Sequence, residues 1–172
     1  MQSKVKLSAY SFILTLIVNL VLIVCCVFTF NEKPGFWIIL SILILLLAFG
    51  LLYGPIKIKI DSNYIIVQSF LLKHKIKIDG IESVELFQPT MGAYRLCASG
   101  GYFGYWGLFR EGDIGRYVAY YGKASDCFLI RMKNGDKYVL GCENPKEIVE
   151  FVRKQIKFSQ ETNKNCEYSS FT

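Results

Sequence analysis

The chain has 172 residues, 52% of them hydrophobic, and a formal net charge of +6 from 20 Lys or Arg against 14 Asp or Glu. The two signs are interspersed, which excludes the blocked basic pattern typical of nucleic-acid-binding proteins. The six cysteines form no C-x-x-C pair and the only histidine is His74, so we expect reduced thiols, no disulfide framework, no metal and no cofactor.

The first third of the chain contains two long apolar runs. Residues 7–30 and 35–54 carry no charged side chain, and Glu32 and Lys33 lie between them. Each run is long enough to cross a hydrocarbon layer of about 30 Å as a helix rising about 1.5 Å per residue. We therefore predict that residues 1–54 form a two-helix transmembrane hairpin. The alternative, a cleaved leader ending near Cys25, fits less well because the apolar run exceeds a usual signal core.

Charged residues flank this hairpin asymmetrically. Lys4 and Lys6 precede the first run, Lys57 and Lys59 follow the second, and the short loop between the runs is neutral. Positive residues stay on the cytoplasmic side of a membrane. We expect an integral membrane protein with both termini in the cytoplasm.

One face of the first run is polar, with side chains at helical spacing. These are Ser8, Ser11, Thr15, Asn19 and Cys26. The second run ends in the G-x-x-x-G pattern of Gly50 and Gly54. Both features are typical of close helix packing, within the hairpin or between copies. An accessory subunit of a small channel or transporter, with a path along this stripe, is an alternative that lacks an ionisable carrier.

From Pro55 onward the apolar pattern has a period of two, typical of strands. The predicted strands are residues 56–60, 64–70, 74–78, 81–87, 116–121, 127–132 and 137–141. Most are joined by short turns, of which Asn134-Gly135 is a strong hairpin signal. Seven such strands predict antiparallel pairing in a sandwich or small barrel, with His74 and Ile76 on its inner face.

A single helix closes this domain of residues 55–158. Asn144 is placed to cap it, Pro145 suits its first position and Glu147 completes a capping box. Its predicted apolar stripe covers an open end of the sheet and consists of Ile148, Phe151, Val152 and Ile156. Residues 159–172 are polar, and we predict that they form a disordered tail.

Seven strands followed by one helix is the order of the pleckstrin-homology (PH) fold. Residues 55–156 resemble the bacterial PH-like domains that follow one or two membrane spans, most specifically in the runs RLCASGGYFGYWGLF, GRYVAYY, CFLIRM, NGDKYVLG and ENPKEIVEFV. An arginine, a Gly-rich aromatic stretch, a Gly-x-Phe and a helix-starting proline are typical of that family. They match Arg95, Gly100-Gly101, Gly107-Leu108-Phe109 and Asn144-Pro145, whereas Gly141-Cys142 replaces an expected Ser-Pro.

The resemblance implies an α+β membrane protein: a transmembrane helical hairpin, then a PH-like seven-stranded antiparallel β-barrel or sandwich capped by a C-terminal helix. It also implies a membrane-tethered interaction module of the bacterial cytoplasmic membrane rather than an enzyme.

An insertion at residues 88–114 combines six glycines with many aromatic side chains. Such a long connection is usually functional or disordered, and its aromatic density disfavours disorder. It could be an extra hairpin packed on the domain, a protein-contact surface, or aromatic residues dipping into lipid headgroups. The candidate interaction residues are Arg95, Tyr102, Phe103, Tyr105, Trp106, Phe109 and Arg110.

A second candidate surface is a basic face on the early strands. It consists of Lys57, Lys59, Lys73, Lys75 and Lys77. These lysines could bind anionic lipid, or simply form a solvated strand face next to the membrane.

No constellation of catalytic residues stands out. His74 alternates onto the inner face, and Glu82 and Glu85 point to opposite faces of one strand. We therefore expect no enzyme, no nucleic-acid partner and no identifiable small-molecule substrate. The expected partners are the bilayer and a membrane-associated protein or a second copy of the chain.

Overall fold

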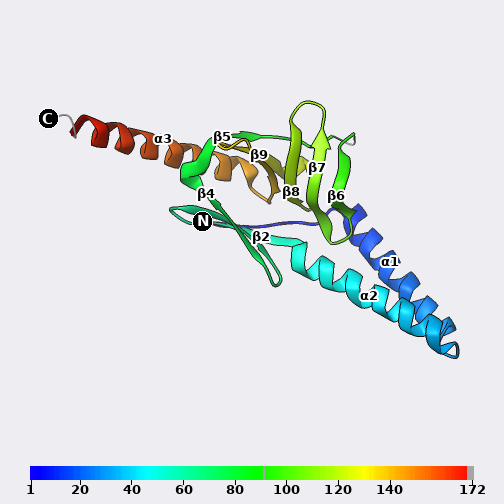
Figure 1. Ribbon diagram of the computed structural model, residues 1–172. Coiled ribbons are helices and arrows are strands. Elements are labelled where there is room, and N and C mark those ends of the chain that lie inside the picture. Colours follow the sequence, from blue (N-terminus) through cyan, green and yellow to red (C-terminus); the bar gives the residue numbers. More distant parts are fainter. Residues whose placement is uncertain (91, 170–172) are drawn as a thin grey trace.

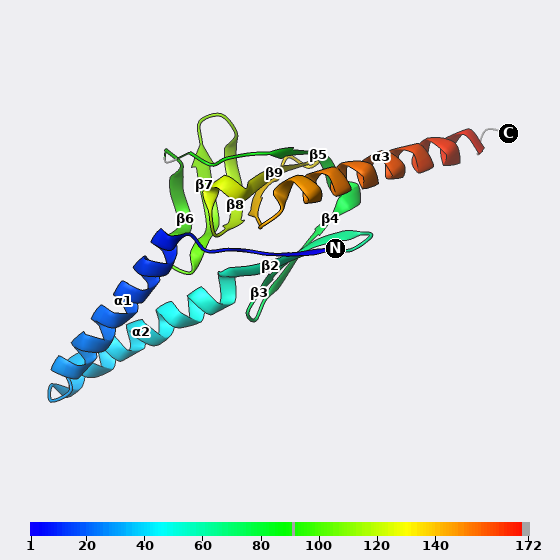
Figure 2. The same ribbon diagram turned by 180° about the vertical axis from the view of Figure 1, so that it is seen from behind.

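The computed structural model describes the backbone of residues 1–90 and 92–169 and the side chains of residues 1–90 and 92–158. Helices α1 (Ala9–Phe28) and α2 (Lys33–Tyr53) form an antiparallel hairpin that projects from a β domain (Figures 1 and 2). Ser8 caps α1 by accepting a hydrogen bond from the Ser11 N–H, and Pro34 lies in the first turn of α2.

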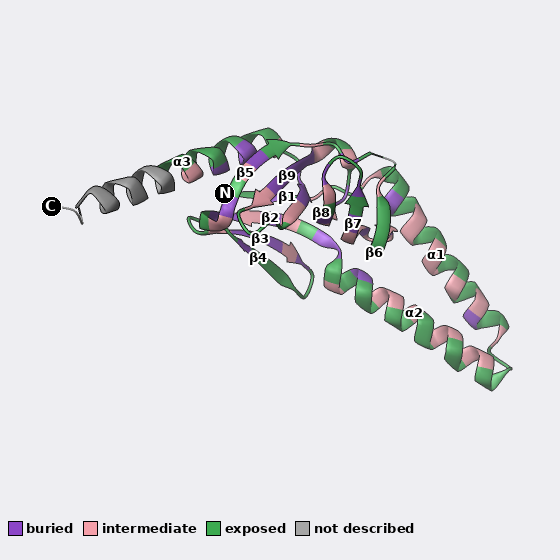
Figure 3. Cartoon of the chain, turned by 45° about the horizontal axis from the view of Figure 1, so that its top comes forward, coloured by how far each residue is buried: buried purple, intermediate pink, exposed green. Residues whose placement is uncertain are grey.

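Both helices are long and apolar enough to cross a membrane. In the most apolar 18-residue stretch of each helix, only 11% of the residues in α1 and 6% of those in α2 are buried. The rest of the described chain therefore covers few of their apolar side chains. Figure 3 shows this as exposed and half-buried residues along both helices. The two predicted runs match the two helices to within a few residues at each end.

The β domain contains two sheets. The first has the strand order β1-β2-β3-β4 and is antiparallel throughout, with β1 (Gln2–Lys4), β2 (Pro55–Ile60), β3 (Tyr64–Ser69) and β4 (Lys73–Lys77). The second has the order β5-β9-β10-β8-β7-β6, with β5 (Ile81–Leu86), β6 (Tyr94–Gly101), β7 (Gly104–Glu111), β8 (Gly115–Tyr121), β9 (Cys127–Met132) and β10 (Lys137–Gly141). Short 3-10 turns, η1 (Ile78–Gly80) and η2 (Ala124–Asp126), lie before β5 and β9.

The inner faces of the two sheets share one hydrophobic core. Ile58 and Ile65 from the first sheet join Phe128 and Ile130 from the second, all fully buried. Helix α3 (Pro145–Ser169) packs against β5 and completes this core with Ile148, Val149 and Val152. Burial of these apolar surfaces is the main term that holds the sheets and α3 together.

All seven predicted strands occur, together with β1, β6 and β7, but the pairing is not antiparallel throughout and the barrel alternative is wrong. β10 lies between β8 and β9 and pairs with β8 in parallel, with Val139 opposite Ala119. The chain passes from β8 to β9, which lies two positions away in the strand order. The hairpin at Asn134-Gly135 then places β10 between these two strands. Within the described residues, the two sheets form no closed barrel, since each retains two edge strands.

Two predictions about the last helix also need correction. The backbone of α3 continues to Ser169, where a disordered tail from residue 159 is predicted. Residues 159–169 contain no Pro or Gly, so nothing in the sequence terminates the helix at Phe158, and residues 170–172 lie outside the described residues. Phe151 is 36% exposed, and the buried stripe includes Val149 in its place.

Candidate interaction site at the junction of the helices and the β domain

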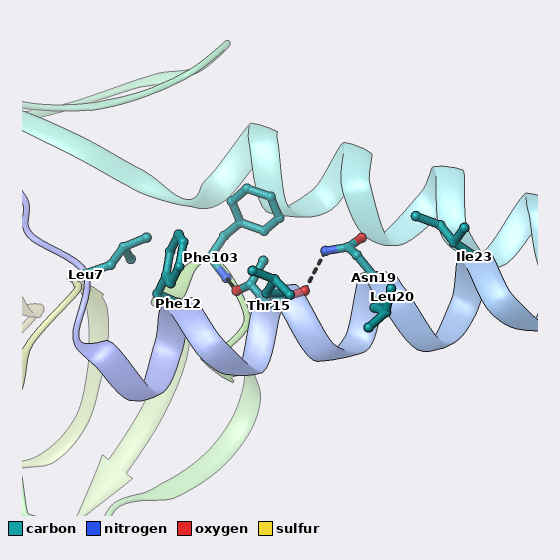
Figure 4. A pocket seen from close by; sticks show the side chains of 8 residues that line it. Leu7, Phe12, Thr15, Asn19, Leu20, Ile23 and Phe103 are labelled. Carbon is teal, nitrogen blue, oxygen red and sulfur yellow. Dashed lines mark hydrogen bonds between the residues drawn. The ribbon is translucent and has the colours of Figure 1, made fainter.

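The predicted insertion at residues 88–114 contains a β-hairpin made of β6 and β7. Its turn places Tyr102 and Phe103 at the tip, between Gly101 at φ +127° and Gly104 at φ +96°. Phe103 itself adopts φ +53°, a left-handed conformation that is rare for a bulky residue and usually reflects a tertiary constraint. The tip lies between α1 and α2, where the helices meet the β domain (Figure 4).

Hydrogen bonds from α1 hold this tip. The Phe103 N–H donates to Thr15 Oγ1 over 3.0 Å, and the Tyr102 hydroxyl donates to Asn19 Oδ1 over 3.2 Å. Asn19 Nδ2 in turn donates to the Thr15 carbonyl over 2.7 Å. Thr15 and Asn19 of the polar stripe on α1 therefore bind a hairpin of the β domain, where the sequence predicts packing against another helix.

The glycines of α2 provide the complementary surface. A Cβ atom on Gly50 would lie 2.4 Å from Phe103 Cδ2, and one on Gly54 would lie 3.1 Å from Phe103 Cβ. Tyr53, which precedes Gly54 on α2, stacks on Trp106 with ring centroids 5.3 Å apart. The G-x-x-x-G pattern thus accommodates an aromatic side chain of the hairpin, because glycine allows its close approach.

The aromatic candidates of the predicted interaction surface are thus largely engaged within the chain. Tyr102, Phe103 and Trp106 contact the helices, Tyr105 stacks on Tyr121 at 4.8 Å, and buried Phe109 stacks on Tyr117 at 5.8 Å. Arg95 and Arg110 are exposed, and the Arg95 guanidinium lies over Gly100. These contacts match the alternative in which the insertion is an extra hairpin packed on the domain.

What remains accessible is the outer edge of β6 at its Tyr94 end, because α1 contacts the strand near Gly101. This strand ends the six-stranded sheet and pairs only with β7 in the described part of the chain. Tyr94 is 74% exposed and Leu96 is 48% exposed. The other edge strand of the sheet, β5, is covered by α3. Sequence alternation could not reveal this edge, because β6 and β7 together contain four glycines and lack a period-two pattern.

Two apolar grooves flank the docked tip. One, of about 490 Å³, lies along α1 beside Phe103 and includes Phe12, Leu16 and Leu20 (Figure 4). The other, of about 480 Å³, lies between Leu46 and Phe49 of α2 and the hairpin. Both follow the helices and are lined almost wholly by apolar atoms, as expected for surfaces that face lipid chains.

The structure places all five predicted lysines on one face of the four-stranded sheet. Lys57 lies opposite Lys4 on β1 and Gln68 on β3, and Gln68 lies opposite Lys73. The next row along the strands contains Lys59 and Lys75, on either side of Ile66, and Lys77 lies opposite Tyr64 beyond them. Residues directly opposite one another share a face of a sheet.

Several titratable side chains lie in or beside the core. His74 is exposed on β4, but its ring lies 5.7 Å from the rings of Tyr120 and Tyr138, and partial burial of the imidazole lowers its pKa. Burial raises the pKa of the Cys127 thiol, and raises that of Cys142 to about 11. Within the described residues no three His, Cys, Asp or Glu side chains are grouped to hold a metal ion. Glu85 pairs with Arg131 at 2.9 Å.

A sequence model of the bacterial PH domain family matches residues 56–156, from β2 into α3. The chain belongs to the bacterial PH domain family. No curated protein and no solved structure matches it. The β6–β7 hairpin lies inside the matched region. β1, α1 and α2 precede that region, and the hairpin and β2 attach to them.

Proposed function

We propose that this protein is a membrane-anchored, non-catalytic interaction module. In this account α1 and α2 cross the bacterial cytoplasmic membrane, and the PH domain binds an extended segment of a protein partner, or of a second copy, along β6. One observation carries the proposal: the domain is attached to the helices in three separate places, before α1, after α2 and at the β6–β7 tip.

The attachment before α1 supports a fixed position at the membrane. The Val5 N–H donates to the Ile56 carbonyl over 2.8 Å, and the Ser8 N–H donates to the Gly122 carbonyl over 2.9 Å. Lys6 pairs with Glu143 at 2.8 Å. The N-terminal segment thus bridges both sheets, so the N-terminus and the PH domain lie on the same side of any membrane the helices cross. The flanking lysines favour the cytoplasmic side.

The unpaired edge of β6 supports a protein as the ligand. An exposed edge presents backbone N–H and C=O groups that an added strand can satisfy, and neighbouring side chains then give specificity. The alternative of a conduction path needs Thr15 and Asn19 free, yet both are hydrogen-bonded to the hairpin. The buried cysteines and the position of His74 beside two tyrosine rings support a non-catalytic role.

Photocrosslinking in intact membranes tests this function. The photoreactive residue p-benzoylphenylalanine is placed at Leu96 on β6 and, as a control, at Leu86 on the covered edge β5; both leucines are 48% exposed. We expect discrete adducts from position 96 and none from position 86. A product of twice the chain mass would indicate a second copy, and another discrete mass a partner. Absence of adducts at position 96, or equal products at both positions, contradicts the proposal.

A further inference from the structure

The turn between β3 and β4 exposes three consecutive large apolar side chains. Phe70 is 65% exposed, Leu71 is 64% exposed and Leu72 is 44% exposed. The Ser69 N–H donates to the Leu72 carbonyl over 2.9 Å, which closes a tight turn. Such an exposed apolar cluster on a folded domain commonly marks an interaction site.

The strand register fixes where this turn lies. Ser69 is paired with Pro55, and Pro55 directly follows Gly54, the C-terminal cap of α2. The turn therefore lies beside the end of an apolar helix, and Figures 1 and 2 both show it pointing toward the side from which the helices project. If α2 spans a bilayer, the turn reaches the interface between headgroups and acyl chains.

Lysines lie near the base of the turn, on one face of the sheet. The row of Lys4, Lys57 and Lys73 lies nearest to α2, and each further row is about 7 Å more distant, two residues along the strands. The four strands contain no Asp or Glu, and none of the ion pairs among the described residues involves these lysines. Lys4 and Lys57 are directly opposite, a placement that is unfavourable without an anion.

We infer that the Phe70-Leu71-Leu72 turn inserts into the bilayer interface and that Lys4, Lys57 and Lys73 bind the phosphate groups of anionic phospholipids. Apolar side chains at the interface and lysines at headgroup level are the two components of peripheral membrane binding. A merely solvated face would mix charges, as the exposed side of α3 does with Lys146, Glu147 and Glu150.

This inference is independent of the strand-binding function proposed for β6, because it concerns the other sheet and another class of ligand. It makes the four-stranded sheet a second membrane contact besides the two helices. It also ranks the lysines: electrostatic attraction falls off within a Debye length of about 8–10 Å, so the row nearest α2 should contribute most and Lys77 least.

Lipid crosslinking of the full chain in nanodiscs tests the inference. p-Benzoylphenylalanine replaces Phe70 in one variant and Phe151, on α3, in a control, in discs of phosphatidylcholine with or without phosphatidylglycerol. Mass spectrometry should find lipid adducts at position 70, enriched in phosphatidylglycerol, and none at position 151. Absence of lipid adducts at position 70, or protein adducts in their place, overturns the inference.

Charge variants test the lysines separately. In the Phe70 photoreactive chain, Lys57→Gln and Lys73→Gln should each lower the ratio of phosphatidylglycerol to phosphatidylcholine adducts about fivefold. The matched changes Lys146→Gln and Lys154→Gln on α3 should leave the ratio unchanged. Equal ratios in all variants would overturn headgroup binding by the lysines. Thermal unfolding serves as the folding control, and the variants should unfold at or slightly above the wild-type temperature because they relieve repulsion.

Discussion

Two turns of the β domain lie beside the helices, and their surroundings differ. The β6–β7 tip is hydrogen-bonded to Thr15 and Asn19 and packs its Phe103 ring against Gly50. The β3–β4 turn has equally apolar side chains at Phe70 and Leu71, yet they are exposed, and lysines lie on the adjoining face of the sheet. The β6–β7 tip is thus engaged within the molecule, whereas the side chains of the β3–β4 turn are exposed to solvent, lipid or another protein.

This difference follows from what each turn faces. α1 offers hydroxyl and amide groups and α2 offers glycines, so a tip that satisfies both is fixed in one position. Among the described residues, no such partner covers the β3–β4 turn, whose Phe70, Leu71 and Leu72 are exposed. Aromatic residues near an apolar helical hairpin therefore do not by themselves indicate a binding surface. The polar and glycine residues of the two helices decide whether the aromatic residues are already engaged within the molecule.

The largest effect on stability is expected from adding a side chain at Gly50 of α2, against which the Phe103 ring packs. Gly50→Leu should displace Phe103, because even a Cβ atom would lie 2.4 Å from its ring. We expect a loss of about 3 kcal/mol in the free energy of unfolding, measured by thermal unfolding of the purified protein in detergent. Ala48→Leu, at an exposed position of the same helix, is the matched control and should be nearly neutral.

Truncating the two aromatic tips compares them directly. Phe103→Ala should cost about 2 kcal/mol through lost packing, whereas Phe70→Ala should change the unfolding midpoint little, because Phe70 is largely exposed. Similar losses of stability for the two variants would show that Phe103 is packed no more tightly than Phe70.

A smaller loss is expected from removing one hydrogen bond of the tip. Thr15→Val keeps the shape of the side chain but removes the oxygen that accepts the Phe103 N–H, at a cost of about 1 kcal/mol. Ser41→Ala removes a hydroxyl that bonds only within α2 and should have less effect. If the two variants unfold alike, the hydrogen bond to the hairpin contributes no stability.

Much of the fold could be predicted from the sequence, because apolar alternation and helix caps are local signals. The outward lysines of β2 and β4 and the start of α3 at Pro145 are examples. β1 could not be predicted, since three residues carry no period. The partner of the polar stripe could not be predicted either: Thr15 and Asn19 indicate that something packs there, but not whether it is a helix or a hairpin tip.

The smallest expected effect is a pH dependence from His74. Burial lowers its pKa, so the unfolded chain takes up a proton at a higher pH than the folded chain does. The associated stability is present above the ordinary pKa of about 6.5 and is lost as the pH falls from there toward the lowered folded value. Thermal unfolding between about pH 7.5 and pH 5 should show a steeper loss for wild type than for His74→Gln. Parallel curves would exclude this contribution.

Hydrogen exchange at the β6–β7 tip measures whether the PH domain is fixed to the helices through this hairpin. In full-length protein in nanodiscs, amides of residues 101–104 should exchange slowly, because the Phe103 N–H is bonded to Thr15 between two helices. Gly50→Leu should make them exchange rapidly. Exchange at the tip as fast as at the exposed Asn134-Gly135 turn in the unmodified chain would contradict the account.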